Sequence, residues 1–590
     1  MGLWGGELTL GREIRGELRI TRRGAVGHAT IAGVETTFAV PRDSICFDLP
    51  RGLGRFRGVV SSAARTVDGF WIQPAPAVAG SRGVGPIDQA YASPLVLDRL
   101  RASKIDALDA IDEWRGDVRP LENRFTLYLR IWRDPSGALV GAFRNPEMNS
   151  IGGASQFRVV QNGDSLWFSA GPDPARPARR LGAVVERATG RIRVDWPDLG
   201  RTLALARLAP SSAASFFPRL PPDTAYVYRP PPATGDGWAT GRARDAGLDE
   251  AALTRLVQDL VRTDPSSRRP ALIHSILVAR HGKLVLDEYF FGFDRDRPHD
   301  LRSAGKTFAS AMLGAAMLRG ARIGPDSSVY AVLAGRGPFA NPDPRKARIT
   351  LAHLMTHTSG LACDDNDDDS PGNEDRMQSQ GAQPDWWRYT LDLPLVHEPG
   401  TRYAYASGGM NLVGAAVTAA TGAWLPEWFA RTVARPLQFG RWYWNLMPTG
   451  EGYLGGGAYV RPRDLLKLGQ AFLDGGAWNG SRIVDSSWVA RSTTARVEIT
   501  PATTGLDSAS FRNAYVPGAD GLAWHLHTLA AGARAVREYE ATGNGGQLLI
   551  VVPGLDLAVV ITAGNYGQGG IWIPWRDTIV AGEILAAIRD

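Results

Sequence analysis

Apolar and polar positions alternate through the first third of the chain. Runs such as 17–21 and 126–132 place an apolar side chain at every second position, which is the period of a half-buried strand. Turn signals separate these runs, for example Asp134-Pro135-Ser136-Gly137. We therefore predict an all-β domain, either a sandwich or a small barrel, over residues 1–208, with one helical interruption at about 94–114.

The composition changes over residues 209–241, where Pro218, Pro221, Pro222 and Pro230-Pro231-Pro232 indicate a stiff, extended linker. Residues 242–590 have a mixed pattern. Apolar runs predict a hairpin at 275–279 and 284–289 and late strands at 547–552 and 557–562, and helices are expected at about 303–318, 410–421 and 575–588. Strands at both ends predict one sheet closed by sequence-distant strands. The expected fold class is α+β, with several domains.

Composition and charge narrow the classes of function. The 590 residues are 44% hydrophobic and 21% charged, which excludes a disordered or fibrous protein. The net charge of +6 comes without a basic block, so we expect no nucleic-acid partner. No apolar run reaches the ~18 residues of a membrane span. The first residues lack a signal pattern, so we expect a cytoplasmic protein, or a periplasmic or secreted one whose signal has been removed.

Metal and cofactor motifs are missing from the sequence. The nine histidines show no metal-ligand spacing, and we expect neither a metal nor a cofactor. Cys46 and Cys363 are expected to be two buried free thiols, with one disulfide as the alternative. The acidic cluster Asp364–Asp369 lacks the spacing of an EF-hand, so a solvated loop is expected and a cation site is the alternative. Trp386 and Trp387 could line a pocket or pack a helix.

Ser303-Ala304-Gly305-Lys306 opens the predicted helix at 303–318. A serine in the first helical turn lies near the positive end of the helix dipole, and a lysine three residues later lies on the same face. A hydroxyl needs a neighbouring base or charge to become a nucleophile, and lysine can supply either. Taken alone, the pair favours the simpler interpretation of a helix cap followed by a surface lysine.

Four further segments follow this pair in order: 353–361, 398–409, 455–465 and 543–547. Together with Ser303 and Lys306 they resemble the serine β-lactamase and penicillin-binding-protein superfamily. The resemblance is strongest to its class C β-lactamase-like esterase and amidase branch, which includes nylon-oligomer hydrolases. It covers about Asp236 to Asp590. It implies an antiparallel sheet flanked by helices, with a mainly helical subdomain.

The resemblance also implies roles for individual residues. Ser303 would be the acylated nucleophile, Lys306 its proton partner, and Tyr405 a general base or proton relay. The oxyanion hole would use the backbone N–H of Ser303 and one near Gly546 or Gln547. Gly545 would belong to the same substrate-binding segment.

Two positions depart from the β-lactamase pattern. Ser407 stands where β-lactamases carry asparagine, and Asn544 stands where the third motif carries lysine or histidine. Both changes remove groups that would hold a β-lactam amide and carboxylate, so an ester or amide substrate without an obligatory carboxylate is favoured.

The sequence thus predicts a serine hydrolase that acts on esters or amides through a Ser303 acyl-enzyme. The alternatives are a peptidase or aminopeptidase directed at D-residue peptides, a true β-lactamase, an acyltransferase, and a non-catalytic binding protein on the same scaffold. The expected partner is a small molecule or short peptide. The role of the β-domain and the oligomeric state, a homodimer included, stay open.

Overall fold

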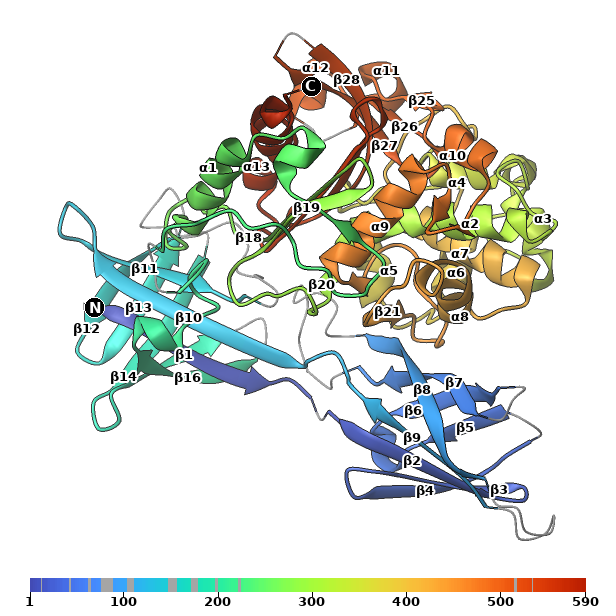
Figure 1. The fold of residues 1–590 in the computed structure, drawn as a ribbon, viewed down its shortest axis with the longest axis horizontal. Helices are drawn as coiled ribbons and strands as arrows, with labels where there is room; N and C mark the ends of the chain where they lie inside the picture. The colour runs from blue at the N-terminus through green and yellow to red at the C-terminus, as the bar shows by residue number, and fades with distance from the viewer. Residues whose placement is uncertain are drawn as a thin grey trace.

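The structure is a computed structural model, and it describes residues 1–11, 13–41, 44–61, 65–75, 89–102, 111–146, 156–170, 179–196, 200–220, 224–513, 517–532 and 534–589. Within these residues the predicted α+β class is confirmed, because β-structure fills the N-terminal part and sheet and helices combine in the C-terminal part (Figure 1).

A closed antiparallel barrel forms one end of the molecule, and it confirms the barrel alternative. Its described strands are β1 (Gly2–Thr9), β10 (Arg124–Arg133), β11 (Leu139–Arg144), β12 (Phe157–Asn162), β13 (Ser165–Ala170), β14 (Arg179–Glu186), β15 (Arg191–Trp196) and β16 (Arg201–Leu208). β1 closes the barrel by pairing with both β10 and β16. Alternate side chains point inward to a core that includes Leu127, Leu129 and Phe168.

The strands between β1 and β10 form a second β unit. They are β2 (Gly16–Arg23), β3 (Val26–Ile31), β4 (Val34–Ala39), β5 (Ser44–Asp48), β6 (Arg55–Val60), β7 (Thr66–Gln73), β8 (Ala90–Ala102) and β9 (Ile111–Val118). This second β unit has its own core around Ile20, Phe56 and Trp114. In Figure 1 it lies apart from the barrel and below the C-terminal part of the chain.

The predicted helix at 94–114 is wrong for the described residues, which form β8 and β9. Leu95 and Leu97 are buried whereas Val96 between them is 48% exposed, so the side chains alternate across a pleat. Because Leu95, Val96 and Leu97 are all apolar, the sequence does not show the alternation between buried and exposed positions. Residues 103–110 of the prediction lie outside the described residues.

Strand β8 also joins the second β unit to the C-terminal part. It pairs antiparallel with β21 (Trp442–Leu446), which continues through β22 (Tyr459–Val460) to β20 (His299–Asp300). One hydrogen-bonded sheet therefore runs across both parts of the molecule.

The C-terminal sheet has the order β17-β19-β18-β30-β29-β28-β27-β26-β25. Its described strands are β17 (Ala239–Thr240), β18 (Ile273–Arg280), β19 (Lys283–Tyr289), β25 (Val497–Glu498), β26 (Ala519–Asp520), β27 (His525–Ala531), β28 (Arg534–Gly543), β29 (Gln547–Val552) and β30 (Leu557–Ala563). The predicted hairpin and late strands are confirmed. β18 pairs with β30, so sequence-distant strands do close the sheet.

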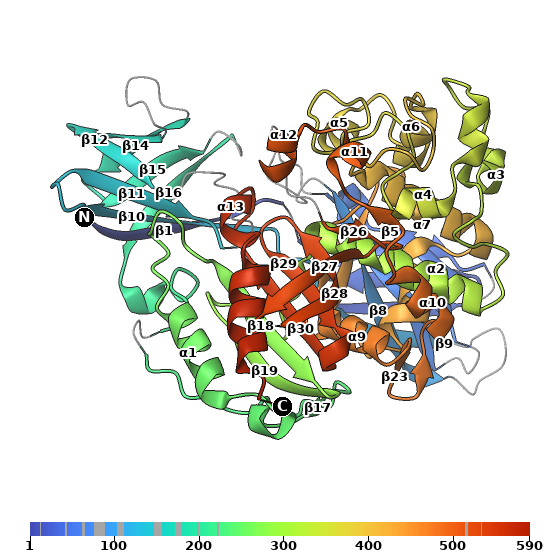
Figure 2. The same ribbon diagram turned by 90° about the horizontal axis from the view of Figure 1, so that it is seen from above.

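Helices cover both faces of this sheet (Figure 2). One face packs against α1 (Glu250–Val261) and the last helical segments, Arg576–Ile584 and Leu585–Ala587. The other face packs against α9 (Pro462–Leu473), and α2 (Phe308–Leu318) and α7 (Ser407–Thr421) belong to the same hydrophobic core. The helices expected at 303–318, 410–421 and 575–588 are thereby confirmed. None of the helices among the described residues combines the length and apolarity needed to cross a membrane.

Short helices complete the helical subdomain and its surroundings. They are α3 (Val329–Val332), α4 (Leu351–Met355), α5 (Glu374–Ser379), α6 (Trp386–Asp392), α8 (Leu425–Phe429), α10 (Ser486–Ser492), α11 (Pro501–Thr504), α12 (Ser508–Asn513) and α13 (Gly569–Trp572).

The chain between β16 and β17 is anchored to the C-terminal sheet. Tyr226 and Tyr228 are buried in the core beneath α1. The buried Arg463 of α9 contacts Asp236 and the β19 carboxylate of Asp287, each at 2.8 Å. Pro221 and Pro222 lie outside the described residues. The division into 1–208, 209–241 and 242–590 stays a prediction.

Candidate active site

The Ser303–Lys306 pair lies at the buried entrance to helix α2. Residues Arg302–Thr307 form a 3₁₀ segment that continues into α2. The Lys306 Nζ donates a hydrogen bond of 2.9 Å to the Ser303 Oγ, and Lys306 is only 4% exposed. A lysine is seldom buried so completely without a partner, so the helix-cap reading of this pair does not account for it.

Backbone geometry directly before the serine is unusual. Arg302 has φ of 48°, in the left-handed region that non-glycine residues rarely adopt. Its N–H donates to the Asp300 Oδ1 at 3.0 Å, and its guanidinium lies 2.8 Å from the Asp300 Oδ2. These two contacts hold the turn that presents Ser303.

Tyr405 completes the group. The Lys306 Nζ lies 4.9 Å from the centre of the Tyr405 ring, and both Ser303 and Lys306 act to lower the pKa of the Tyr405 phenol. The structure therefore brings together the three side chains expected to be catalytic, from the start of α2 and from the loop before α7.

Burial and charge set the protonation of this group. Burial raises the pKa of Tyr405, against the opposing effect of the Lys306 ammonium. Burial alone would lower the pKa of Lys306, but Tyr405, Glu374 and Asp365 outweigh it, and the pKa of Lys306 is raised. At neutral pH the resting site therefore holds an ammonium and a neutral phenol.

Asp365 fixes the loop that carries Tyr405. Its N–H donates to the Tyr405 carbonyl at 2.7 Å, its Oδ2 accepts from the Ser407 N–H at 2.6 Å, and its Oδ1 accepts from the Glu374 N–H at 2.9 Å. Burial and the neighbouring Glu374 charge raise the pKa of Asp365 to about 7, against the effect of Lys306. Ser407 is fully buried at the start of α7.

Strand β28 passes along the 3₁₀ segment that carries Ser303. β27 begins at His525, opposite Glu540, so Ala541, Thr542 and Gly543 extend beyond it. Ala541 and Thr542 line a small cavity together with Ser303 and Lys306. A side chain at Gly543 would meet the Leu301 carbonyl at 2.3 Å.

The expected 543–547 segment is only partly at this site. Asn544 lines the cleft that reaches Ser303, and its Oδ1 accepts from the Gly567 N–H at 2.8 Å. Gly545 packs beneath Tyr566, and Gly546 packs beneath Trp575. Gln547 is buried and bonds through its amide to both backbone groups of Ala563. Among the described residues, the lining of this cleft includes none of these last three predicted positions.

Two histidines that the sequence analysis did not identify lie beside Tyr405. His525 contacts Asp520 at 2.6 Å, and its ring centre lies 6.3 Å from that of Tyr405. The His357 ring is tilted against the Tyr405 ring with their centres 4.5 Å apart, and its Nδ1 accepts from the Ala406 N–H at 3.1 Å. His357 lies in the segment 353–361 and could have been found there. His525 carried no motif signal.

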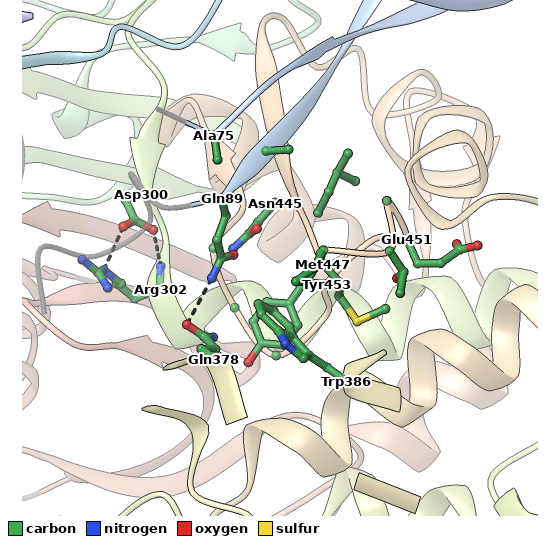
Figure 3. Close-up of a pocket in the computed structure, with 18 of the residues that line it drawn as sticks. Ala75, Gln89, Asp300, Arg302, Gln378, Trp386, Asn445, Met447, Glu451 and Tyr453 are labelled. Carbon is green, nitrogen blue, oxygen red and sulfur yellow. Dashed lines mark hydrogen bonds and ion pairs between the residues drawn. The ribbon is translucent and has the colours of Figure 1, made fainter. Parts of the chain in front are cut away.

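A wide cleft leads from Ser303 across two parts of the molecule. Its lining includes Tyr405, Trp386 and Tyr453 from the C-terminal part and Arg57 from the second β unit. Figure 3 shows a portion of it, where Gln89, just before β8, donates to Gln378 at 3.1 Å. The expected pocket role is thus supported for Trp386.

Trp387 and the acidic loop have structural roles. Trp387 is buried in the core, where the Arg336 guanidinium lies over its ring at 4.6 Å. Within the described residues, the carboxylates of Asp364–Asp369 do not form a group of three converging ligands. Asp367 instead accepts from the Asp369 N–H, and Asp369 pairs with Arg376.

The two cysteines are free. Cys363 is buried, as expected, whereas Cys46 is exposed on β5, so the prediction of two buried thiols is wrong for Cys46. Because β5 belongs to an antiparallel sheet with one solvent-facing side, its alternate positions point to solvent.

Comparisons with known proteins find curated relatives that match part of this chain. Acyltransferase mokF of Monascus pilosus is 30% identical over 157 residues, which cover 24% of this chain and 37% of that protein. The 6-aminohexanoate-dimer hydrolase of Paenarthrobacter ureafaciens is 25% identical over 222 residues, covering 36% and 55%. The chain thus spans about a third to about half the length of these curated relatives.

A penicillin-binding protein homologue from Caulobacter crescentus is a similar solved structure, with 14% identity, a TM-score of 0.44 and coverage of 58% of this chain and 98% of that one. The family model named Beta-lactamase matches residues 253–569, which include Ser303, Lys306 and Tyr405. Since this match covers more than half of the chain, the protein belongs to the Beta-lactamase family.

Proposed function

We propose that the protein is a serine hydrolase that cleaves ester or amide bonds through an acyl-enzyme on Ser303. The observation that carries this proposal is the buried hydrogen bond of 2.9 Å between the Lys306 Nζ and the Ser303 Oγ, with the Tyr405 ring centre 4.9 Å from the same Nζ. A purely binding protein gains nothing from burying an ammonium against a serine hydroxyl, since burial of a charge is costly.

In the first half-reaction the Ser303 Oγ attacks the substrate carbonyl carbon, and a carbon–oxygen bond forms. The Lys306–Tyr405 pair first loses one proton to solvent, so that it can accept the serine proton. It then passes that proton to the leaving alcohol or amine as its bond to the carbonyl breaks. In the second half-reaction water attacks the ester carbon of the acyl-enzyme, gives up a proton to the same pair, and releases the acid. Ser303 regains its proton in this step.

The oxyanion that forms in both steps needs two fixed donors. The backbone N–H of Ser303, near the start of α2, is the first donor we propose. For the second we propose an N–H of β28 between Ala541 and Gly543, because this stretch borders the cavity beside Ser303 and extends beyond β27. This replaces the segment at Gly546 and Gln547 as the proposed location.

Two features of the cleft favour a substrate larger than a short acyl chain. Its lining combines both parts of the molecule, and its aromatic members include Trp386, Trp424 and Tyr453. The Arg57 guanidinium of the second β unit lies over the Trp424 ring at 4.4 Å. We propose that the second β unit forms the outer wall against which such a substrate lies. D-residue peptides and β-lactams remain alternative substrates.

Acyl transfer is a second candidate function, because one relative at 30% identity is named an acyltransferase. The same acyl-enzyme would then react with an alcohol or amine in place of water. Product analysis after adding such an acceptor separates the two functions, since transfer yields a new ester or amide and hydrolysis yields the acid.

The first test compares Ser303→Ala with the unaltered chain on p-nitrophenyl esters and D-amino-acid amides. We expect the turnover to fall by at least about 10³-fold, since the nucleophile is lost. A fluorophosphonate probe should add one label to the unaltered chain, mapped by mass spectrometry to Ser303.

Ser486→Ala is the matched control, because Ser486 is an exposed serine in the first turn of α10. It should keep both the turnover and the label. Undiminished turnover in folded Ser303→Ala would refute the proposed function.

A further inference from the structure

A second cluster of polar side chains lies on the β27–β28 hairpin, beyond the catalytic group. His527 and Glu538 are directly opposite each other across the two strands, and His525 and Glu540 form the next such pair. Ligand-type atoms of His527, Glu538 and Glu540 all lie within 4.8 Å of one another. Side chains two positions apart share a face of a sheet, which is why the hairpin brings these three together.

The carboxylates of this cluster are buried and incompletely paired. Glu538 is 2% exposed and Glu540 is fully buried. Neither oxygen of Glu538 has a hydrogen-bond partner among the described residues, nor does the Oε2 of Glu540. An ionised carboxylate in such a place costs several kcal/mol unless a cation or a proton balances it.

One positive side chain is already present. The Arg576 Nη1 lies 3.4 Å from the Glu540 Oε1, and the His527 Nε2 lies 3.2 Å from the same oxygen. One guanidinium balances one of the two carboxylates. The ionised cluster therefore keeps one negative charge, and Glu538 is the carboxylate without a direct contact.

We propose that His527, Glu538 and Glu540 bind one divalent transition-metal cation, with Zn²⁺ as the reference ion. One imidazole nitrogen and two carboxylate oxygens are a donor set that this class of ion accepts, with water in the remaining position. Bond lengths of about 2.0–2.2 Å require only small side-chain rotations from the present separations. Arg576 then keeps its contact with the Glu540 carboxylate and fixes the orientation of that carboxylate.

The place of the site gives it a structural role. β28 runs from Glu538 and Glu540 directly to Ala541 and Thr542 beside Ser303. A cation that ties His527 on β27 to Glu538 on β28 fixes this hairpin against the nucleophile. The proposal does not depend on the acyl-enzyme, because no step of that chemistry passes through the cation.

Spacing in the sequence could not indicate this site. His527 and Glu538 are separated by the turn of the hairpin, and the ligands become neighbours only through strand pairing. The sequence-based expectation of no metal rested on the absence of known metal-binding motifs, all of which are defined by spacing along the chain.

The test is equilibrium dialysis of the chelator-treated full chain against Zn²⁺, followed by metal analysis. We expect one zinc per chain, at least tenfold weaker binding in Glu538→Gln and in His527→Asn, and unchanged binding in Glu498→Gln. Glu498 is the matched control because it is exposed on β25 of the same sheet.

A second readout uses the unaltered chain and so does not depend on the folding of variants. Co²⁺ in place of Zn²⁺ should give visible absorption bands of a nitrogen- and oxygen-coordinated ion. Absence of both stoichiometric zinc and these bands would overturn the proposal, and a proton shared by the two glutamates would then balance the charge. Binding that both variants leave unchanged would overturn it as well.

Discussion

At the scale of single residues, Asp365 links the protonation of the site to its geometry. It holds the backbone at Tyr405 and at Ser407 through its own N–H and its Oδ2, and its charge contributes to the raised pKa of Lys306. The reactive state of the Ser303–Lys306–Tyr405 group has lost one proton relative to the resting state. The rate should therefore rise as the pH increases above neutrality.

Asp365→Asn should change the pH profile of kcat/KM in two separable ways. Loss of the negative charge lowers the pKa of Lys306, so the rising limb moves to lower pH. Loss of a carboxylate acceptor weakens the hold on Ser407 and Tyr405, so the plateau falls by about 10-fold or more. Both quantities come from rates measured between pH 5 and 10 on one ester.

Asp368→Asn is the control for this variant, because Asp368 is exposed in the same loop. This variant should change neither the pH of the rising limb of kcat/KM nor the height of its plateau. A limb that stays in place in Asp365→Asn would contradict the electrostatic role.

Asp365 also affects stability. Its pKa is about 7 in the folded chain, and an unfolded aspartate titrates near 4. The folded state therefore binds the extra proton between these values, and the contribution to stability is lost as the pH rises through 7.

The residues that the sequence identified and those that it missed differ in a physical way. Ser303 and Lys306 are neighbours on one helical turn, and Tyr405 lies in a segment with a recognisable order of residues. His525, Asp520 and Asp365 reach the site through strand pairing and loop folding, which leave no fixed spacing. The sequence predicted the three side chains proposed to react. It did not predict the residues that position these side chains and shift their pKa values.

At the scale of elements, the packing of β28 on the 3₁₀ segment positions Ser303, the proposed nucleophile. The strand crosses so closely at Gly543 that a Cβ there would lie 2.3 Å from the Leu301 oxygen and 3.0 Å from the Ala304 nitrogen. Both contacts are with backbone, which cannot rotate away. The glycine is required by this close approach and not by an unusual φ.

Gly543→Ala should therefore displace the segment that carries Ser303. We expect kcat to fall by about 10²-fold, since a shift near 1 Å at a reacting group has such an effect. Circular dichroism should show an intact fold, because the change is confined to one crossing.

Gly554→Ala tests whether any glycine substitution near this sheet has the same effect. Gly554 lies in the turn after β29, and nothing stands within 4 Å of its Cβ position. Its kcat should stay unchanged. Equal activity of Gly543→Ala would show that the crossing does not position Ser303.

Prediction of elements from the sequence was accurate where one face is clearly apolar. Strand β18 and helix α2 were found because their side chains are almost entirely buried, and β19 was found because Leu284, Val285 and Leu286 form a short buried apolar run. The error at β8 arose because Val96 is apolar but exposed. The pairing of β1 with both β10 and β16 depends on contacts far apart in the chain, which no local pattern records.

At the scale of the whole molecule, buried histidines lie where the barrel meets the C-terminal part. The His274 Nδ1 and the His299 Nε2 are 2.8 Å apart, and Arg144 of β11 approaches the other side of His274 at 3.5 Å. Burial lowers the pKa of both histidines, to about 4 for His299, and the nearby Arg297 guanidinium acts in the same direction.

This contact should be sensitive to acid. An unfolded histidine titrates near 6.5, so the stability that the neutral pair contributes is complete above that pH and is lost as the pH falls toward 4. We expect the Tm to fall over this interval, and we expect His299→Gln to reduce the fall because it removes one buried titrating group.

His28→Gln, at an exposed position on β3, is the matched control and should leave the pH dependence of Tm as it is. Calorimetry at several pH values provides the measurement. Equal slopes for His299→Gln and the unaltered chain would contradict this assignment.

The pairing of β8 with β21 has a practical consequence for work with shortened chains. A fragment that begins after the barrel and the second β unit would lose β8, leaving the backbone groups of Trp444 and Leu446 without their strand partner. It would also uncover the aromatic surface that Phe70 covers beside Trp424 and Trp442. Unpaired edges and bare apolar surface promote aggregation. Recombinant production of the C-terminal part alone should therefore yield insoluble protein, and soluble material should require the N-terminal residues in the same polypeptide.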